Sequence, residues 1–521
     1  MSRILTTLRG RLLVAIAVTG SLLASTSWAT ADTSSSASEQ VIVTSDSATD
    51  AAWLANLAGG QAGNSLPLVN AVAAQLTASQ VGYLTSLGVT VTPDVSVPVT
   101  MAEDNPPHAP SDVFPQVTGA SQLTANGTTG AGVGVAVLDT GIDALPDFSG
   151  RLVDGVDFTG EGNPFQDDYG HGTFVAGLIA GNGASSGGAY VGEAPGANLI
   201  SIKVAGASGV AHASTIIRGI DWAIKHADSD NIRVLNLSLG AIPTGPTATE
   251  PMDQAVERAW QAGIVVVASA GNSGPNLGTI LSPGDDPMVM TVGANDDNAT
   301  VTPTDDAIPS FSSEGPTQFD GWLKPDLVAP GRSVISLAAP GSTIYNTYPS
   351  AMVGSANFVG SGTSFSTAIT SGATALLLQA HPYATPNRVK ARLLTAADPA
   401  ASANPVVAGH GELDVAAATA MPAITLSQSS GQSVAKTSSG VIPMSASWTL
   451  STWNPANYSG PETTVTGTTW NGSTWNGTTW NGTTWNGTTW NGTTWNGTTW
   501  NGTTWNGTTW NGTTWNGSTW N

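Results

Sequence analysis

The sequence predicts an α/β domain with a mostly parallel central sheet and helices on both faces. Between residues 110 and 421, apolar strand-like runs alternate with longer helical patterns, and this alternation is typical of parallel sheets. Ahead of it, residues 32–109 carry strand and helix patterns of their own, which predict a small α+β domain. Behind it, a five-residue unit repeats from residue 468 onward and predicts a low-complexity tail. We therefore expect several structural units.

The composition excludes several classes of function. The 521 residues include 15 basic and 36 acidic side chains, for a formal net charge of −21. A nucleic acid or an anionic membrane would require a basic patch to neutralise phosphate, so neither is an expected partner. Cysteine is absent, which excludes disulfides, thiolate metal sites and a cysteine nucleophile. Core packing must therefore hold the protein together.

The first residues have the pattern of a secretory signal peptide. Three arginines precede or border an apolar run at residues 12–23, which is too short to span a bilayer. Small residues at positions 29 and 31 then provide a cleavage site. A membrane anchor is the alternative, but no later apolar run reaches about 18 residues. We expect residues 1–31 to be a signal peptide and the protein to be secreted, with an extracellular location and no transmembrane segment after signal removal.

The segment from residue 32 to residue 109 is interpreted as a small domain followed by a proline-rich linker at residues 105–110. A plain N-terminal subdomain is the alternative. Thr77 and Gln80 form a capping-box pattern, which predicts the start of a helix. The expected elements are strands at residues 40–44, 66–76 and 89–91 and a helix from residue 77 through residue 87.

The central segment contains the elements that predict the parallel sheet, and about 310 residues suffice for one large core. Strands are expected at residues 133–138, 198–204, 232–237, 264–268 and 288–292. Helices are expected at residues 173–179, 214–225, 251–262, 366–380 and 386–396.

After residue 421 the composition changes twice. Residues 422–467 are rich in Ser, Thr and Ala and are interpreted as a linker. Residues 468–521 repeat the unit Trp-Asn-Gly-Thr-Thr, with tryptophan at every fifth position from 470 to 520. One interpretation is a flexible, uncharged stalk. The other is a surface-tethering tail, because regularly spaced exposed indoles offer stacking faces for sugar rings.

Two candidate functional residues occupy the ends of predicted elements. Asp139 ends the apolar strand run VAVLD, and in α/β sheets sites form outside the carboxyl ends of strands. A carboxylate there needs a partner, although it can also simply cap a turn. His171 lies between Gly170 and Gly172 at the start of a helical pattern, and the glycines allow close backbone packing and leave the imidazole reachable.

Ser364 and Asn272 occupy two further junctions. Ser364 stands in the run GTSFSTA ahead of an apolar helical stretch. A serine there can be a helix cap; beside a base, it is an activated hydroxyl close to the positive end of the helix dipole. Asn272 ends the strand-like run GIVVVASAGN, where its amide could donate to an oxyanion.

These motifs resemble those of the subtilisin-like serine proteases, the subtilases. Asp139, His171 and Ser364 occur in the order Asp, His, Ser, which is the order found in subtilisin. The resemblance covers the whole central segment, and the N-terminal unit is similar to the inhibitory propeptides of that family. The repeat tail lies outside it. Further segments that are similar to the family lie at residues 234–240, 311–316 and 324–331.

The resemblance implies a serine endopeptidase that hydrolyses protein and peptide substrates through an acyl-enzyme intermediate. It also implies a zymogen with a cleavable propeptide at residues 32–109, a peptidase domain at residues 110–421, and the propeptide as inhibitor. Ser364 would attack the peptide carbonyl, His171 would carry the proton, and Asp139 would orient the imidazole.

The amide of Asn272 and the backbone N–H of Ser364 would form the oxyanion hole. Because the walls expected for the first specificity pocket are small, the resemblance favours a large apolar residue before the scissile bond. Five residues would line that pocket: Ser238, Leu239, Gly240, Ala270 and Gly271.

Some positions depart from the family pattern. Phe174 and Phe365 replace a common histidine and a common methionine, and neither change removes a catalytic group. Residues 182–190 lack the asparagine-rich calcium loop of the secreted bacterial subtilisins. No cofactor is required for the reaction. The sequence does not decide whether a structural calcium ion, the one metal considered, is bound. Three pairs of aspartates could supply oxygen ligands, although such pairs are more often solvated surface charge: Asp285, Asp286, Asp296, Asp297, Asp305 and Asp306.

The competing hypothesis is a surface-binding protein in which the tryptophan repeat carries the function and the protease fold is incidental. Loss of a triad residue or of the oxyanion asparagine would favour it, and all four residues are present. We therefore expect a protease, with cell-surface or polysaccharide contact through the tail as an addition.

Overall fold

The computed structural model describes residues 37–99, 101–102, 110–398, 402 and 404–421, together with the backbone of short strands between residues 434 and 520. The predicted signal peptide, most of the proline-rich linker and much of the segment 422–467 lie outside these residues. Within the described part of the chain, no helix combines the length and the apolar character needed to cross a bilayer.

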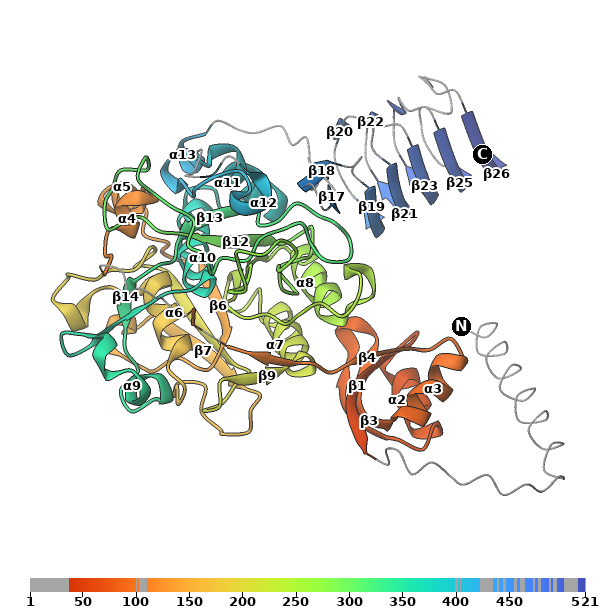
Figure 1. The fold of residues 1–521 in the computed structure, drawn as a ribbon, viewed down its shortest axis with the longest axis horizontal. Coiled ribbons are helices and arrows are strands. Elements are labelled where there is room, and N and C mark those ends of the chain that lie inside the picture. The colour runs from red at the N-terminus through yellow and green to blue at the C-terminus, as the bar shows by residue number, and fades with distance from the viewer. Residues whose placement is uncertain are drawn as a thin grey trace.

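The N-terminal unit is a four-stranded antiparallel sheet in the order β2-β3-β1-β4 with two helices (Figure 1). The predicted α+β class is therefore confirmed. Its elements are β1 (Ser38–Thr44), α2 (Ala48–Leu57), β2 (Gln61–Leu66), β3 (Ala71–Thr77), α3 (Ala78–Ser86), β4 (Thr90–Pro93) and β5 (Ser96–Pro98).

The single strand predicted over residues 66–76 is wrong, because the chain turns within it. β2 ends at Leu66, a 3₁₀ turn covers Pro67–Val69, and Asn70 follows with φ of 54°. Proline fixes its own φ and has no N–H to donate, and asparagine tolerates the left-handed region. The chain therefore reverses before β3 begins.

The capping box predicted in this unit is confirmed. The Thr77 N–H donates to Gln80 Oε1 at 2.8 Å, and the Gln80 N–H donates to Thr77 Oγ1 at 3.4 Å. Helix α2 was not predicted, although Ser47 caps it by accepting the Asp50 N–H at 3.1 Å.

The main domain contains a seven-stranded sheet in the order β13-β12-β11-β10-β6-β8-β7, and every neighbouring pair is parallel. The predicted α/β class is confirmed. The strands are β6 (Gly134–Asp139), β7 (Leu152–Asp157), β8 (Asn198–Lys203), β10 (Ile232–Leu237), β11 (Val265–Ser269), β12 (Met290–Asn295) and β13 (Leu327–Pro330).

Two pairs of helices flank this sheet. Helix α6 (His171–Ala180) packs on α10 (Thr363–Ala380), and α7 (Ala213–Lys225) packs on α8 (Pro251–Gln261). The smaller elements are α4 (Phe114–Val117), α5 (Ala120–Ala125), β9 (Val210–His212), β14 (Val334–Leu337), α9 (Thr343–Thr347), β15 (Met352–Val353), β16 (Asn357–Gly360), α11 (Pro386–Ala396), α12 (Pro405–Ala408) and α13 (Val415–Ala420).

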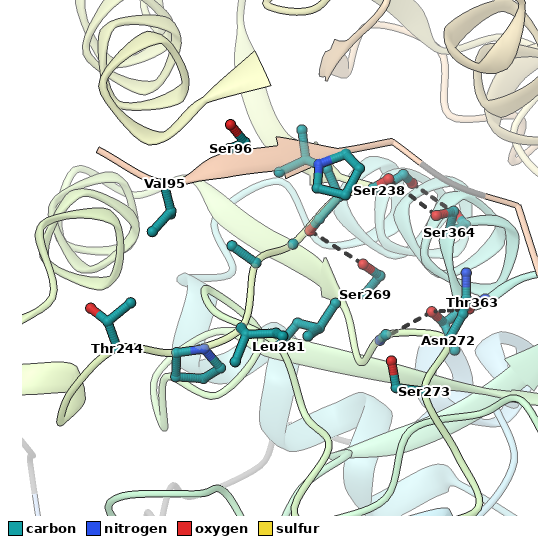
Figure 2. Close-up of a pocket in the computed structure, with 17 residues that line it drawn as sticks. Val95, Ser96, Ser238, Thr244, Ser269, Asn272, Ser273, Leu281, Thr363 and Ser364 are labelled. Atoms are coloured by element: carbon teal, nitrogen blue, oxygen red, sulfur yellow. Dashed lines mark hydrogen bonds between the residues drawn. The ribbon is translucent and has the colours of Figure 1, made fainter. Parts of the chain in front are cut away.

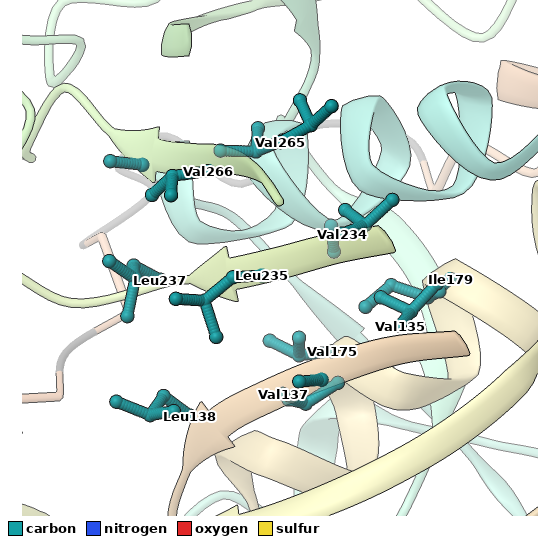
Figure 3. Packing of buried hydrophobic residues seen from close by; sticks show 14 of the residues in the cluster. Val135, Val137, Leu138, Val175, Ile179, Val234, Leu235, Leu237, Val265 and Val266 are labelled. Carbon is teal, nitrogen blue, oxygen red and sulfur yellow. The ribbon is translucent and has the colours of Figure 1, made fainter. Parts of the chain in front are cut away.

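The core lies between the sheet and these helices (Figure 3). Every residue of β6 and β11 is buried, as expected for central strands of a parallel sheet that is covered on both faces. Val175 and Ile179 of α6 belong to the same cluster as Val135 and Leu235. Each such side chain contributes roughly 1.5–3 kcal/mol by leaving water, so this packing fixes the strand ends on which the site is built.

The N-terminal unit shares part of this core. Ile42, Leu66 and Val69 belong to the same buried cluster as the main domain. Asp94 accepts the Ser214 N–H at 2.8 Å and its hydroxyl at 2.7 Å, which places a carboxylate at the N-terminal end of α7. The two units are therefore joined by apolar packing and by a buried polar contact.

Between residues 434 and 520, in the segment interpreted as a linker and in the repeat, the described backbone forms strands that pair in parallel, apart from one antiparallel pair at residues 434–443. β19 (Ser447–Trp453), β21 (Thr464–Asn471), β23 (Thr479–Asn486), β25 (Thr494–Trp500) and β26 (Thr514–Trp520) make one sheet. A second sheet contains β20 (Asn457–Ser459), β22 (Thr474–Asn476) and β24 (Thr489–Trp490), and β17 (Val434–Thr437) pairs with β18 (Gly440–Pro443). Register pairs Thr464 with Thr479 and Thr479 with Thr494, so β21, β23 and β25 are offset by three five-residue units, whereas Thr494 pairs with Thr514 of β26, an offset of four units.

Candidate active site

Asp139 and His171 are hydrogen-bonded in the core of the main domain. Asp139 is the last residue of β6, and His171 is the first residue of α6. The imidazole Nδ1 lies 2.9 Å from Asp139 Oδ1 and 3.0 Å from Oδ2, and both side chains are almost fully buried. A carboxylate in this position holds the proton on Nδ1 and leaves Nε2 able to accept another.

The glycines beside His171 are required by the backbone. Gly170 has φ of 107°, in the left-handed region that favours glycine. A Cβ at position 172 would lie 2.1 Å from the Gly141 carbonyl oxygen. Helix α6 can therefore begin directly against the loop that follows Asp139.

A second buried carboxylate ties these two loops together, and its role was not predicted from the sequence. Asp167 accepts the Thr140 hydroxyl at 2.8 Å and the N–H groups of Gly170 and Thr173 at 2.7 and 2.8 Å. Thr140 in turn accepts the Gly172 N–H at 2.9 Å. Burial raises the pKa of the Asp167 carboxyl, and these hydrogen bonds oppose the rise. The network fixes where α6 starts.

Ser364 is the second residue of α10 and is buried. The ring of Phe365, the next residue, lies 5.7 Å from the His171 ring between centroids. Ser364 Oγ donates to the Ser238 carbonyl at 3.1 Å, and Ser238 Oγ donates to the Ser364 carbonyl at 2.7 Å. His171 Nε2 is buried and has no hydrogen-bond partner among the described residues. The Ser364 hydroxyl donates to the Ser238 carbonyl instead, and hydrogen bonds between a nucleophile and its base often tighten only with substrate.

Asn272 lies at the same helix start. Its Oδ1 accepts the N–H and the hydroxyl of Thr363, each at 2.9 Å. Because these two donors fix the oxygen, the amide nitrogen is directed away from Thr363. A Cβ at position 362 would lie 3.4 Å from that nitrogen. Asn272 was predicted from its place after a strand, whereas its anchor Thr363 was not assigned a role.

A groove of about 600 Å³ extends from Ser364 (Figure 2). Four of the five residues predicted for the first specificity pocket line it, namely Ser238, Leu239, Gly240 and Gly271. Ala270 is fully buried and is not one of the lining residues. The remaining lining residues are Val95, Ser96, Pro98, Ala241, Ile242, Pro243, Thr244, Ser269, Asn272, Ser273, Leu281, Thr363 and Ser364.

A segment of the chain itself runs along this groove. β5 pairs antiparallel with β9, and the Val99 N–H donates to the Gly209 carbonyl at 2.8 Å. Further along, the Ala102 N–H donates to the Ser361 carbonyl at 2.8 Å. The chain is therefore bound as an extended strand ahead of the nucleophile position and is held again just beyond it.

Two of the aspartates proposed as calcium ligands, Asp296 and Asp297, make other contacts. No three of the described acidic or histidine side chains converge in a metal-binding arrangement. Asp296 pairs with Arg332 at 3.0 Å, and Asp297 accepts the Ser111 hydroxyl at 2.8 Å. Burial raises the pKa of Asp286 to about 6, and Asp285, whose pKa is raised by burial and by the charge of Asp286, is its direct neighbour. Calcium binding therefore stays a prediction.

Comparison with known proteins gives a consistent result. Residues 130–431, more than half of the chain, match the model of the subtilase family, Peptidase_S8. Serine protease AprX of Bacillus subtilis (strain 168) is 44% identical over 311 residues, which are 58% of this chain and 70% of AprX. Subtilisin E of the same strain is 36% identical over 345 residues, which are 64% of this chain and 77% of subtilisin E.

A solved structure also has a similar fold. Fervidolysin from Fervidobacterium pennivorans, a keratinolytic enzyme related to subtilisin, aligns with a TM-score of 0.59 at 23% identity. The alignment covers 74% of this chain and 61% of the fervidolysin chain. At that identity the likeness concerns the fold alone. The family match and the two sequence relatives show that this chain belongs to the subtilase family of serine endopeptidases.

Proposed function

We propose that this chain is a secreted subtilase, made as a zymogen, whose catalytic triad is Asp139, His171 and Ser364. The observation that carries the proposal is the buried Asp139–His171 pair, whose imidazole contacts the ring of Phe365, the residue that follows the buried Ser364 at the N-terminal end of α10. Asn272, held by Thr363 at the same helix start, supports the assignment of an oxyanion donor.

The reaction follows from these positions. Ser364 Oγ forms a bond to the peptide carbonyl carbon, and His171 Nε2 takes its proton. The developing oxyanion accepts from the Asn272 amide and from the Ser364 N–H. His171 then gives the proton to the leaving amine as the peptide bond breaks, and water attacks the acyl-enzyme in the second half of the reaction. Asp139 stabilises the imidazolium formed in each half.

A serine-directed organophosphorus inhibitor tests this function. We expect it to abolish hydrolysis of casein and to add one adduct per molecule, on the peptide that contains Ser364. Ser366, two residues further along α10, is fully buried and has no hydrogen-bond partner among the described residues. It should stay unmodified. Full activity after treatment would refute the assignment.

We further propose that the N-terminal unit is an inhibitory propeptide whose last strand is β5. A strand bound along the groove excludes substrate, and the contacts of Val99 and Ala102 bracket the position at which Ser364 would attack. The first processing cut is therefore expected in the segment between Val99 and Ala102, ahead of the proline-rich linker that marks the boundary at residue 109.

N-terminal sequencing of the earliest processed species tests this prediction. The new N-terminus is expected at position 100, 101 or 102, and the uncut chain should be inactive on short peptides because β5 fills part of the groove. A first cut near residue 110, or an active uncut chain, would contradict it.

The tail is proposed as a surface-tethering segment. Its tryptophans recur at every fifth position, and aromatic faces stack on sugar rings. A pull-down on insoluble polysaccharide or cell envelopes should retain the full chain more strongly than a chain that ends at Met421, with nearly equal peptidase activity on a small chromogenic peptide. Equal retention of both would show that the tail is a spacer.

A further inference from the structure

Leu281 lies between the two walls of the groove next to Ser364. A Cβ at Gly240, on one wall, would lie 2.8 Å from Leu281 Cβ. A Cβ at Gly271, on the other wall, would lie 2.7 Å from Leu281 Cγ and 2.9 Å from Cδ1. The absence of side chains at both glycines is therefore what gives the leucine its space.

Backbone hydrogen bonds hold Leu281 in this place. Its N–H donates to the Ala270 carbonyl at 3.0 Å, on the Gly271 side. The next residue, Ser282, exchanges N–H donors with Ala241 at 2.9 Å in both directions, on the Gly240 side. Because the segment is bonded to both walls, a substrate side chain cannot displace the backbone of Leu281 without breaking these bonds.

We propose that Leu281 is the floor of the first specificity pocket and limits its depth. A side chain of the size of alanine, threonine or valine fits above the leucine, whereas an aromatic ring would need the space that the leucine occupies. This inference rests on the proposed function, and it replaces the large apolar residue expected from the small walls alone. Figure 2 shows Leu281 among the residues that line the groove.

Two further observations agree with a preference for a small, uncharged residue before the scissile bond. Every described lining residue of the groove is uncharged, so nothing on its surface would pair with a basic or an acidic substrate side chain. In the sequence, Val99, Thr100 and Met101 precede the three bonds at which the first cut is proposed. None of them is aromatic or charged.

Tetrapeptide p-nitroanilides that differ only in the residue before the scissile bond test this proposal. The processed wild-type enzyme is expected to hydrolyse the alanine substrate with kcat/KM at least about ten-fold above that of the phenylalanine substrate. One to a few methylene groups in a closed pocket change kcat/KM by roughly 10–200-fold. In Leu281→Ala, the ratio of phenylalanine to alanine hydrolysis should rise about ten-fold or more.

Ile242→Ala is the matched control, because it also removes three carbon atoms from a residue lining the same groove. Ile242 is 73% exposed, so its loss should leave the ratio within about two-fold of wild type. Leu281→Val, a smaller change, provides an intermediate ratio if the alanine variant fails to fold.

Two outcomes would overturn the proposal: a wild-type preference for phenylalanine or arginine, or an unchanged ratio in active Leu281 variants. Failure of the proposed function gives a different result. A wild-type enzyme that hydrolyses none of the peptides and takes no organophosphorus label would contradict the catalytic role of Ser364, not the role of Leu281 in specificity.

Discussion

Ser364→Ala is expected to lower kcat by about 10⁶-fold, the size of the loss when the nucleophilic serine of subtilisin is removed. The variant removes the only oxygen that would form the acyl-enzyme bond in the proposed mechanism. The fold should survive, because the change removes one hydrogen bond, to the Ser238 carbonyl, which is worth about 1 kcal/mol. Hydrolysis of casein and thermal unfolding by circular dichroism measure the two effects.

The control is Ser366→Ala on the same helix. Its hydroxyl is as buried as that of Ser364 but has no hydrogen-bond partner among the described residues, so activity should be kept. If processing is autocatalytic, Ser364→Ala should also accumulate with the N-terminal unit attached. If Ser364→Ala hydrolysed casein at the wild-type rate, Ser364 would not be the nucleophile.

The four residues proposed for the chemistry could be predicted from the sequence because each is marked by its own short motif. Asp139 and Asn272 follow apolar strands, His171 stands between glycines, and Ser364 precedes an apolar helical stretch. Strands β6 and β11 belong to the same parallel sheet, whose carboxyl ends lie at one edge. Local pattern therefore suffices for Asp139 and Asn272, which follow strand ends, and for His171 and Ser364, which mark helix starts.

Other parts of the site depend on contacts between distant segments. The hydrogen bond from Thr140 to Asp167 and the packing of Leu281 between Gly240 and Gly271 exist only after the loops have met. No residue spacing in the sequence predicts these two contacts. In the proposal made above, the pocket is shallower than its walls alone predict, because its floor comes from a residue outside the wall motifs.

The elements that were missed have local causes as well. β7 is partly exposed and carries two aspartates and a glycine, so it lacks the continuous apolar run of the central strands. β13 has four residues and ends in proline. Helix α2 could have been found from its serine cap at position 47, whereas the turn at Pro67 and Asn70 was concealed by apolar residues on both sides.

Asp139→Asn is expected to lower kcat by about 10⁴-fold while the fold is preserved. The reason is the direction of hydrogen bonds around the carboxylate. The Thr140 N–H donates to Asp139 Oδ1 at 2.8 Å, so an asparagine must place its carbonyl oxygen there. Its NH₂ group then takes the place of Oδ2, 3.0 Å from His171 Nδ1. The NH₂ group repels an Nδ1–H, and the carbonyl oxygen, 2.9 Å from Nδ1, already accepts from the Thr140 N–H, so the variant favours the tautomer with the imidazole proton on Nε2.

With the proton on Nε2, His171 cannot take a proton from Ser364, and the neutral amide of the variant cannot stabilise an imidazolium by charge. The variant should therefore lose kcat with little change in KM on a peptide p-nitroanilide. Asp154→Asn is the matched control, because Asp154 likewise accepts the N–H of the next residue, Gly155, at 2.8 Å, but lies on β7 away from the site. It should keep activity close to wild type. An Asp139→Asn enzyme within ten-fold of wild type would show that Asp139 does not set the tautomer of His171.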